Sequence, residues 1–249
     1  MTIDDTHSLA MMREAWEHKP VLRRIYGEQY FGRLLAHFAS GTAALEIGSG
    51  LGFIREFAPN VIRTDILPTD GIHLMVNAHH LPFGNGVFDN VLGLDVLHHF
   101  NKPIAFMEEV SRVLRTGGRL LMVEPWITPF SRFIYTFLHQ EFCDMSARPW
   151  KKEDEQFQGT KKAFDGNPAI PYLLIERGGQ ETATAVPTLQ LSHIECFSSL
   201  TYLLSLGFKP GILVPNFAYP TLYRFEEATR PVWAKLAALR ALIVWTKTS

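Results

Sequence analysis

Residues 44–53 read ALEIGSGLGF, which places three glycines directly after a short apolar run. Glycine-rich turns of this kind let a nucleotide-type cofactor approach the backbone closely. The glycines follow the spacing G-x-G-x-G, whereas a dinucleotide-binding turn reads G-x-G-x-x-G and this chain has Phe53 at the last position. No Gly-Lys-Ser/Thr follows, so the turn is not a Walker loop. Glu46 would repel a pyrophosphate but attract a cationic amino group, which favours a positively charged cofactor.

Alternating strands and helices must position this turn. Strands are predicted over residues 43–47, 61–65, 72–76, 90–94 and 119–123, and helices over 51–57 and 104–114. One or two helices, including residues 21–38, precede the first strand. This alternation indicates an α/β fold with a parallel sheet and helices on its faces.

The alternation stops after the last of these strands. Residues 125–140 predict an aromatic-rich helix, and a polar stretch follows. A helix over 197–206, a strand over 212–214, a helix over 223–239 and a strand over 241–247 complete the chain. We expect a single domain, residues 1–249, with N-terminal helices at 1–40, a cofactor-binding core at 41–125, a lid and substrate insertion at 126–195, and C-terminal helices and strands at 196–249.

Several features, in this order and spacing, resemble the class I S-adenosylmethionine-dependent methyltransferases, in their small-molecule, type 11-like branch. Glu46 and the three glycines match the first motif, E/D-x-G-x-G-x-G, and Asp65 ends the second predicted strand. NVLGLDVLHHF and EEVSRVLRTGGRLLMVEP look like the fourth strand, its helix and the fifth strand. The resemblance implies a Rossmann-like, mostly parallel seven-stranded sheet with a helical lid insertion after the fifth strand, and S-adenosylmethionine as cofactor.

The resemblance also implies roles for single residues. Asp65 would accept the ribose hydroxyls, Glu46 would support the methionine ammonium group, and the carbonyl of Asn77 would accept the adenine amino group. The implied cofactor-binding set is Glu46, Gly48, Ser49, Gly50, Gly52, Asp65, Ile66, Asn77, Ala78, Leu94 and Asp95. Only eleven residues separate Asp65 from Asn77, so the helix usual between the second and third strands is predicted to be absent or reduced to one turn near Pro68.

The acceptor is expected at the carboxyl ends of the strands, where open α/β sheets bind ligands. The predicted acceptor-binding residues are His98, Glu124, Trp126, Glu141 and Asn167. His99 is predicted to be the general base, because imidazole titrates near neutral pH, with His139 as the alternate. A purely structural role for the His98–His99 pair at the start of a helix stays open. His139 and Glu141 could supply half of a metal site, but without further spaced ligands no metal is predicted.

The implied reaction is methyl transfer to a small or amphipathic organic acceptor, with oxygen as the preferred acceptor atom. Transfer to nitrogen or carbon, including a lipid or glycolipid acceptor, is the alternative. A nicotinamide-dependent oxidoreductase is opposed by Phe53 and Glu46. A protein that keeps the cofactor pocket without turnover also stays open.

Composition limits the partners. The chain has 249 residues and a net charge of −1, so no positive field attracts nucleic acid. Two cysteines, Cys143 and Cys196, are expected to be free thiols in a reducing compartment. The chain has no leader-like N-terminus and no run of about 18 apolar residues, which favours a cytoplasmic protein. The basic residues of 223–249 leave peripheral membrane contact open, although packing on the sheet is favoured, and the oligomeric state is not predicted.

Overall fold

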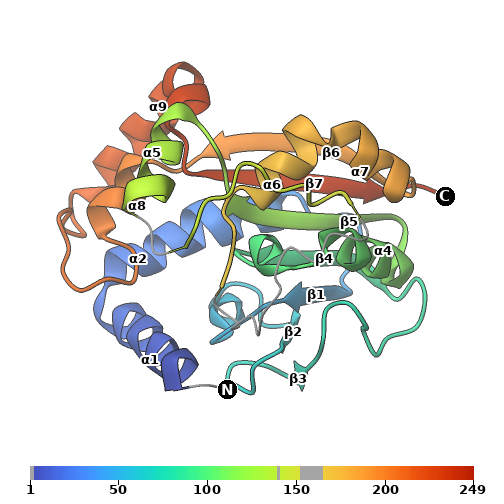
Figure 1. The fold of residues 1–249 in the computed structure, drawn as a ribbon. Coiled ribbons are helices and arrows are strands. Elements are labelled where there is room, and N and C mark those ends of the chain that lie inside the picture. Colours follow the sequence, from blue (N-terminus) through green and yellow to red (C-terminus); the bar gives the residue numbers. More distant parts are fainter. Residues whose placement is uncertain (1–2, 139–140, 152–164) are drawn as a thin grey trace.

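A central seven-stranded sheet organises the computed structural model, which describes residues 3–138, 141–151 and 165–249 (Figure 1). Its strand order is β3-β2-β1-β4-β5-β7-β6, and only the pairings of β7 with β5 and β6 are antiparallel. The strands are β1 (Ala44–Ile47), β2 (Ile62–Asp65), β3 (Leu74–Met75), β4 (Phe88–Leu94), β5 (Leu114–Pro125), β6 (Leu189–Phe197) and β7 (Arg240–Lys247). The Rossmann-like, mostly parallel sheet predicted from the sequence is therefore confirmed.

Helices cover both faces of the sheet. One face packs against α4 (Pro103–Val113), α6 (Ile170–Tyr172) and the π-helical turn η4 (Leu173–Arg177), next to α7 (Gly179–Ala185). The other face packs against α1 (Ile3–His18), α2 (Pro20–Arg24), the π-helical η1 (Ile25–Phe31), α3 (Gly32–Ala36), α8 (Leu200–Ser205) and α9 (Tyr219–Ala237). The remaining helical segments are α5 (Pro129–Phe137) and the short 3-10 turns η2 (Phe53–Glu56) and η3 (Leu97–His99).

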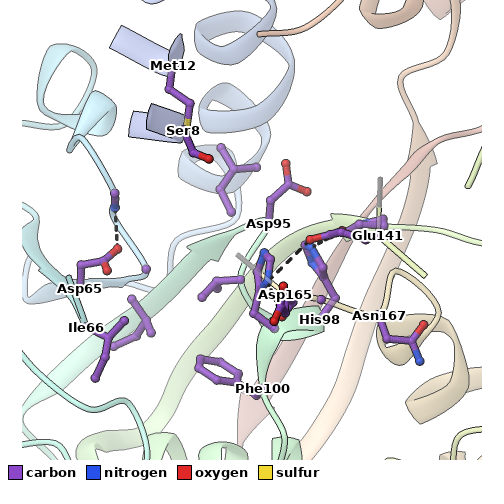
Figure 2. A pocket seen from close by; sticks show the side chains of 18 of the residues that line it. Ser8, Met12, Asp65, Ile66, Asp95, His98, Phe100, Glu141, Asp165 and Asn167 are labelled. Carbon is purple, nitrogen blue, oxygen red and sulfur yellow. Dashed lines mark hydrogen bonds and ion pairs between the residues drawn. The ribbon is translucent and has the colours of Figure 1, made fainter. Parts of the chain in front are cut away.

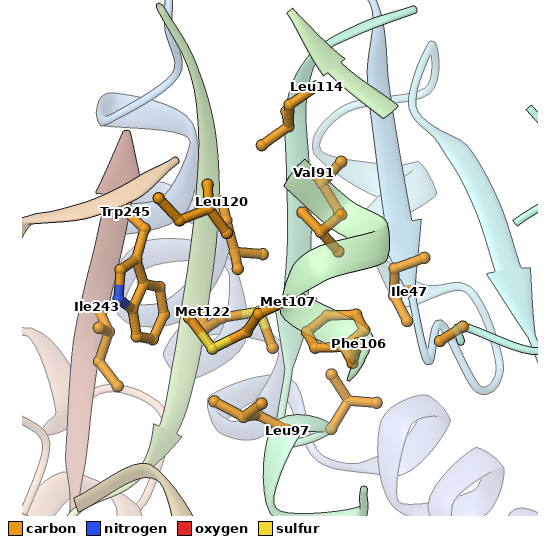
Figure 3. Close-up of a cluster of buried hydrophobic side chains, with 14 of the residues drawn as sticks. Ile47, Val91, Leu97, Phe106, Met107, Leu114, Leu120, Met122, Ile243 and Trp245 are labelled. Atoms are coloured by element: carbon orange, nitrogen blue, oxygen red, sulfur yellow. The ribbon is translucent and has the colours of Figure 1, made fainter. Parts of the chain in front are cut away.

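The core follows from the alternation of side chains along buried strands. On β5, Leu120 and Met122 pack toward the face that α4 covers, where they meet Met107 (Figure 3). Leu121 and Val123 belong to the cluster on the opposite face, with the N-terminal helices. The central strands are thus buried on both sides, which explains their continuous apolar runs.

One predicted strand is wrong, and one observed strand was not predicted. Residues 212–214 form no strand, because Leu213 and Val214 donate their backbone N–H groups to the carbonyl oxygen of Leu204 instead of to a neighbouring strand. Strand β6 was not predicted, and most of it lies inside the expected insertion 126–195. β6 lies at the edge of the sheet, and most of its central side chains are exposed or half-buried, so it lacks the apolar pattern of the other strands.

Other boundaries differ because of local backbone chemistry. The predicted helix 51–57 is reduced to η2, since Gly52 has φ +67° and cannot be a helical residue. The predicted helix 125–140 begins at Pro129, because Thr128 caps it: its hydroxyl accepts from Ser131 N, and the Ser131 hydroxyl accepts from Thr128 N. α9 begins at Tyr219, earlier than predicted.

Several further predictions are confirmed. No helix is assigned between β2 and β3, a segment that the structure describes in full. The connection instead packs against the glycine turn: a Cβ on Gly52 would lie 2.2 Å from the backbone carbonyl oxygen of Gly71. Cys143 and Cys196 are both free thiols. Among the described residues, none of the helices combines the length and the apolar character needed to cross a membrane.

Candidate active site

A cavity of about 1770 Å³ opens at the carboxyl ends of β1, β2 and β4. Figure 2 shows Asp65 and Ile66 on one side of it, His98 and Glu141 on the other, and Asp95 between them. Helix α1 contributes Ser8 and Met12 to the wall. Single ligands occupy cavities of roughly 300–1,000 Å³. The cavity therefore has room for two such molecules.

The glycine turn forms one wall of this cavity. Gly48 and Gly50 both have positive φ angles, +68° and +53°. A Cβ on Gly48 would lie 2.4 Å from Val96, whereas a Cβ on Gly50 would meet nothing within 4 Å. Ser49 ties the turn to β2, because its N–H donates to Thr64 O at 2.9 Å and its hydroxyl accepts from Thr64 N at 3.1 Å. Gly48 is needed for packing, and Gly50 leaves open space for a ligand.

Glu46 lines the cavity, although its side chain is almost entirely buried. Its Oε2 atom has no hydrogen-bond partner among the described residues. Burial raises the pKa of Glu46 to about 7, against the nearby charge of Arg63, which lowers it. A buried carboxylate oxygen without a partner is uncommon in native proteins and fits a site completed by a ligand's donor. A ligand ammonium group would supply both the donor and the compensating charge.

Asp65 ends β2 and also faces the cavity. Its Oδ2 accepts from Gly50 N at 2.7 Å and its Oδ1 accepts from Leu67 N at 2.8 Å. Burial raises its pKa despite these hydrogen bonds. Since a carboxylate can accept about four hydrogen bonds, two positions remain for ligand hydroxyls. Asp65 thus fixes the glycine turn as well as offering a ribose site.

Asn77 and Ala78 line the cavity beside Ile66, as the resemblance implies. The side-chain oxygen Oδ1 of Asn77, however, already accepts from His79 N at 3.0 Å and lies 3.1 Å from His79 Nδ1. This local turn uses the oxygen that was expected to accept the adenine amino group. Leu94 and Asp95, at the end of β4, also line the cavity.

His98 is buried between two carboxylates. Its Nδ1 lies 2.7 Å from Glu124 Oε2, and its Nε2 lies 3.6 Å from Glu141 Oε2. Burial alone would lower the pKa of His98, but hydrogen bonds and charges from Glu124 and Glu141 raise it to about 10. His98 is therefore a cation at neutral pH and cannot accept a proton from an acceptor.

His99 has the opposite protonation state. Its Nδ1 lies 3.1 Å from the carbonyl oxygen of Asp165, a contact in which the ring nitrogen donates. Burial and the neighbouring His98 cation lower the pKa of His99 to about 4. His99 lines the cavity and is unprotonated at neutral pH. The alternate base, His139, lies outside the described residues.

Comparison with known proteins agrees with this geometry. A family model described as "Methyltransferase domain" matches residues 45–122. The chain is 27% identical to methyltransferase GfsG of Streptomyces halstedii over 116 residues, 46% of this chain and 42% of that protein, so the match spans less than half of the relative. The domain match covers the glycine turn, the Asp65 carboxylate and the strands that carry them. Residues 45–122 are therefore a methyltransferase domain.

Solved structures agree at the level of the fold. A SAM-dependent methyltransferase of Thermotoga maritima, titled a possible histamine N-methyltransferase, has a TM-score of 0.52 and 15% identity, covering 97% of this chain and 99% of that one. A SAM-dependent methyltransferase of Archaeoglobus fulgidus has a TM-score of 0.51 and 15% identity, covering 90% and 94%. At this identity the likeness concerns the fold alone.

Two residues predicted to bind the methyl acceptor lie elsewhere. Glu124 is fully buried, does not line the cavity, and accepts from Val96 N at 2.8 Å and Leu97 N at 2.7 Å in addition to His98. Trp126 packs in the core, with its ring centroid 5.3 Å from that of Tyr172. Both predictions of acceptor contact are corrected: Glu124 positions His98 and the turn around it, and Trp126 stabilises the core.

Asn167 and Glu141 do line the cavity. The side chain of Asn167 accepts from Asp144 N and donates to Asp144 O, both at 3.0 Å, so its polar atoms join two chain segments. A Cβ on Gly166 would lie 2.7 Å from His98 and 2.8 Å from Glu141 Oε1. Segment 165–167 therefore lies directly against the His98–Glu141 pair of the methyltransferase.

Two groups of side chains bring possible metal ligands together. The ligand atoms of His98, His99 and Glu141 lie within 4.8 Å of one another, as do those of Asp95, His98 and Glu124. Nδ1 of each histidine already makes a hydrogen-bond contact with an oxygen, and His98 is protonated. A protonated imidazole donates hydrogen bonds instead of binding a metal. In the described residues, ion pairs within the protein connect both groups, between His98 and the two carboxylates of Glu124 and Glu141 and between Asp95 and Arg240.

Sequence reasoning missed Arg240 at the start of β7. Its Nε lies 3.2 Å from Asp95 Oδ1, its Nη1 donates to the Tyr135 hydroxyl at 2.9 Å, and its guanidinium lies 5.2 Å from the Tyr202 ring centroid. Asp95 itself has φ +52°, a strained conformation for a residue other than glycine. The one feature of the sequence that could have pointed to Arg240 is its position directly before the apolar run ALIVW.

Helix α1 was also missed as part of the cavity. It is anchored by Trp16, which stacks on Phe53 with centroids 3.9 Å apart and planes 4° apart. Phe53 is the residue that breaks the dinucleotide-binding glycine pattern. Its side chain thus serves to dock α1 beside the glycine turn of the methyltransferase.

Proposed function

We propose that the protein transfers the methyl group of S-adenosylmethionine to an oxygen of a small or amphipathic acceptor. The observation that carries the proposal is Glu46, whose buried oxygen has no partner among the described residues, in a cavity where Gly50 leaves open space. The cofactor supplies an electrophilic methyl carbon and a neutral sulfide leaving group. Glu46 would hold its ammonium end and Asp65 its ribose.

The residues of this chain would align the acceptor and exclude water, which are the main requirements of an in-line displacement. In the transfer, the acceptor oxygen uses a lone pair to bond the methyl carbon while the carbon–sulfur bond breaks and its electrons stay on sulfur. α1 borders the cavity with Ser8 and Met12, and α5 borders it with Ile134 and with Leu138, which directly follows the helix. We further propose that the part of residues 126–175 that borders the cavity acts as a lid over the bound molecules. Residues 139–140 and 152–164 of this range lie outside the described residues.

We propose His99 as the group that receives the acceptor proton. It is unprotonated at neutral pH, whereas its neighbour His98 is already a cation. A pKa of about 4 makes His99 a weak base. A weak base suffices if the proton leaves as the oxygen gains positive charge during methyl transfer, because the hydroxyl is then strongly acidic.

The test combines binding with product formation. Calorimetry with S-adenosylhomocysteine should show one site per chain, and isotopically methyl-labelled cofactor incubated with cell extract should give a labelled product by mass spectrometry. Fragmentation of that product should place the label on oxygen. A label on nitrogen or carbon would refute the O-methyl assignment, and the absence of cofactor binding would refute the function itself.

The role of His99 needs a variant with a matched control. With the acceptor identified, His99→Ala should lower turnover by ~10²–10⁴-fold, the usual range for a general base, with little change in the S-adenosylhomocysteine Kd. His80→Ala, at a histidine that does not line the cavity, is the control and should retain turnover. Near-normal turnover of His99→Ala would contradict the assignment.

A further inference from the structure

Helix α5 presents an apolar stripe to solvent. Phe130, Phe133 and Phe137 are spaced three and four residues apart, so they lie on one face of the helix. Phe133 is 54% exposed and Phe137 70%, and their ring centroids lie 5.2 Å apart. Exposed aromatic side chains that cluster in this way usually mark an interaction surface.

Helix α9 carries a second stripe. Phe225, Val232 and Leu236 follow at intervals of seven and four residues, which again places them on one helix face. All three are exposed, Val232 to 80%. α5 packs against α9, and the two helices lie side by side at one end of the molecule (Figure 1). We call the two stripes together the α5–α9 face.

The exposed charges of these two helices are positive. Arg132 on α5 and Arg224 and Lys235 on α9 are exposed. The acidic residues of α9 are engaged elsewhere: Glu226 is buried and accepts from the backbone of Ser199 and Thr201, and Glu227 pairs with Arg33 at 2.6 Å. Apolar stripes accompanied by basic residues are typical of helices that lie in the headgroup region of an anionic bilayer.

The same segment borders the cavity. Ile134 and Leu138 of the α5 segment and Phe142 beyond it line the cavity, whereas Phe133 and Phe137 face solvent. An apolar molecule would therefore meet apolar side chains on both sides of α5. This continuity links the exposed face to the site where the acceptor is proposed to bind.

We propose that the α5–α9 face docks the protein on a lipid surface that carries anionic headgroups, and that an acceptor with an apolar chain enters the cavity from that surface. The entry of the acceptor rests on the proposed methyltransferase function, whereas the docking does not. A second copy of the chain fits the face less well, because a symmetric dimer would bring its arginine and lysine side chains opposite their own copies. No described helix spans a membrane, so the docking is peripheral.

Vesicle co-sedimentation of the full chain tests the docking. The protein should bind phosphatidylcholine vesicles that contain phosphatidylglycerol, and should bind pure phosphatidylcholine more weakly. The double variant Phe133→Ser and Phe137→Ser should weaken binding by about tenfold or more, because two aromatic side chains are no longer buried in the bilayer. Arg132→Glu combined with Lys235→Glu should abolish the preference for phosphatidylglycerol. Met75→Ser, at an exposed methionine on the opposite sheet edge, is the matched control and should bind normally.

Three results would overturn the proposal: no sedimentation with either vesicle, equal binding to both compositions, or a dimer in solution that the Phe133→Ser, Phe137→Ser variant converts to monomer. S-adenosylhomocysteine calorimetry on the same samples separates this proposal from the preceding one. Cofactor binding without vesicle binding would refute only the docking, and vesicle binding without cofactor binding would refute only the methyltransferase function.

Discussion

The two walls of the cavity are built in different ways. The cofactor wall comes from residues 46–78, and its shape depends on backbone groups, such as the open turn at Gly50 and its N–H bond to Asp65. The opposite wall, which we call the acceptor wall after its proposed role, gathers side chains from α1, α5, η3 and β7, which are far apart in the sequence. It is held by charged pairs, among them His98–Glu124 and Asp95–Arg240.

The two walls also differ in how their charges are compensated. On the cofactor wall, Oε2 of Glu46 has no hydrogen-bond partner among the described residues, which suits a cationic ligand. On the acceptor wall, the carboxylates of Glu141 and Asp95 lie next to His98 and Arg240, which compensate them. Under the proposed function, the first wall would recognise the charge of the cofactor, and the second wall would recognise the shape and apolar surface of the acceptor.

The largest effect is expected where the acceptor wall depends on one buried carboxylate. Glu124→Ala would leave the His98 cation and two backbone N–H groups without their acceptor. Removing one partner of a buried ion pair typically costs about 3–5 kcal/mol. Urea unfolding should show a loss of this size, and Glu124→Gln, which keeps a carbonyl acceptor, should lose less. Equal stability of wild type and Glu124→Ala would contradict a wall held by charged pairs.

A smaller effect is expected on the cofactor wall. Asp65→Ala should weaken S-adenosylhomocysteine binding by ~1–3 kcal/mol, because ligand hydroxyls lose their acceptor. Asp65 also accepts from Gly50 N, so Asp65→Asn, which keeps one oxygen, should fall between wild type and Asp65→Ala in calorimetry. An unchanged Kd for Asp65→Ala would remove Asp65 from the site.

The same contrast explains which features could be predicted. β1, β2, β4, α4 and the glycine turn were predicted because their shape follows from local patterns: apolar strands, positive-φ glycines and a helix between two strands. The short connection without a helix between β2 and β3 was also predicted, because it has too few residues to form a helix.

The acceptor wall could not be predicted in this way. Arg240 reaches Asp95 across 145 positions, and Glu124 reaches His98 only because β4 and β5 are neighbours. Because Glu124 lies near the end of a strand, it was expected to face the acceptor. Its side chain instead points into the core, where it makes three hydrogen bonds. Such side-chain pairs depend on tertiary contacts that no local spacing encodes.

A moderate effect of pH is expected on the cofactor wall alone. The raised pKa of Glu46, about 7, means that a cationic ligand must displace a proton at low pH. The Kd for S-adenosylhomocysteine should therefore be roughly eightfold lower at about pH 7.5 than at about pH 6, with proton release in calorimetry. Glu46→Gln should bind more weakly and lose this pH dependence. A Kd of the wild type that does not change with pH would contradict a carboxylate–ammonium contact.

In the protein without ligand, the effect of pH on stability is opposite to its effect on ligand binding: a rise in pH weakens the folded state. Because the folded pKa of Glu46 lies above its ordinary value of 4.5, the native state holds the proton more tightly than the unfolded chain. The contribution of Glu46 to the free energy of unfolding is complete below about pH 4.5 and is lost as the pH rises through about 7. Glu46→Gln should show a smaller decrease over this range in urea unfolding.

The smallest effect is expected on the acceptor wall, and it separates the two walls most directly. His98 has a pKa of about 10 and His99 of about 4, so neither changes its protonation state between pH 5 and 8. With an identified acceptor and saturating cofactor, kcat should therefore vary less than about twofold over this range, whereas the KM for the cofactor should fall as Glu46 ionises. An ordinary histidine base would instead give a decrease in kcat below about pH 6.5. Such a decrease would mean that burial and the His98 cation do not hold the pKa of His99 low, and the description of this wall would fail.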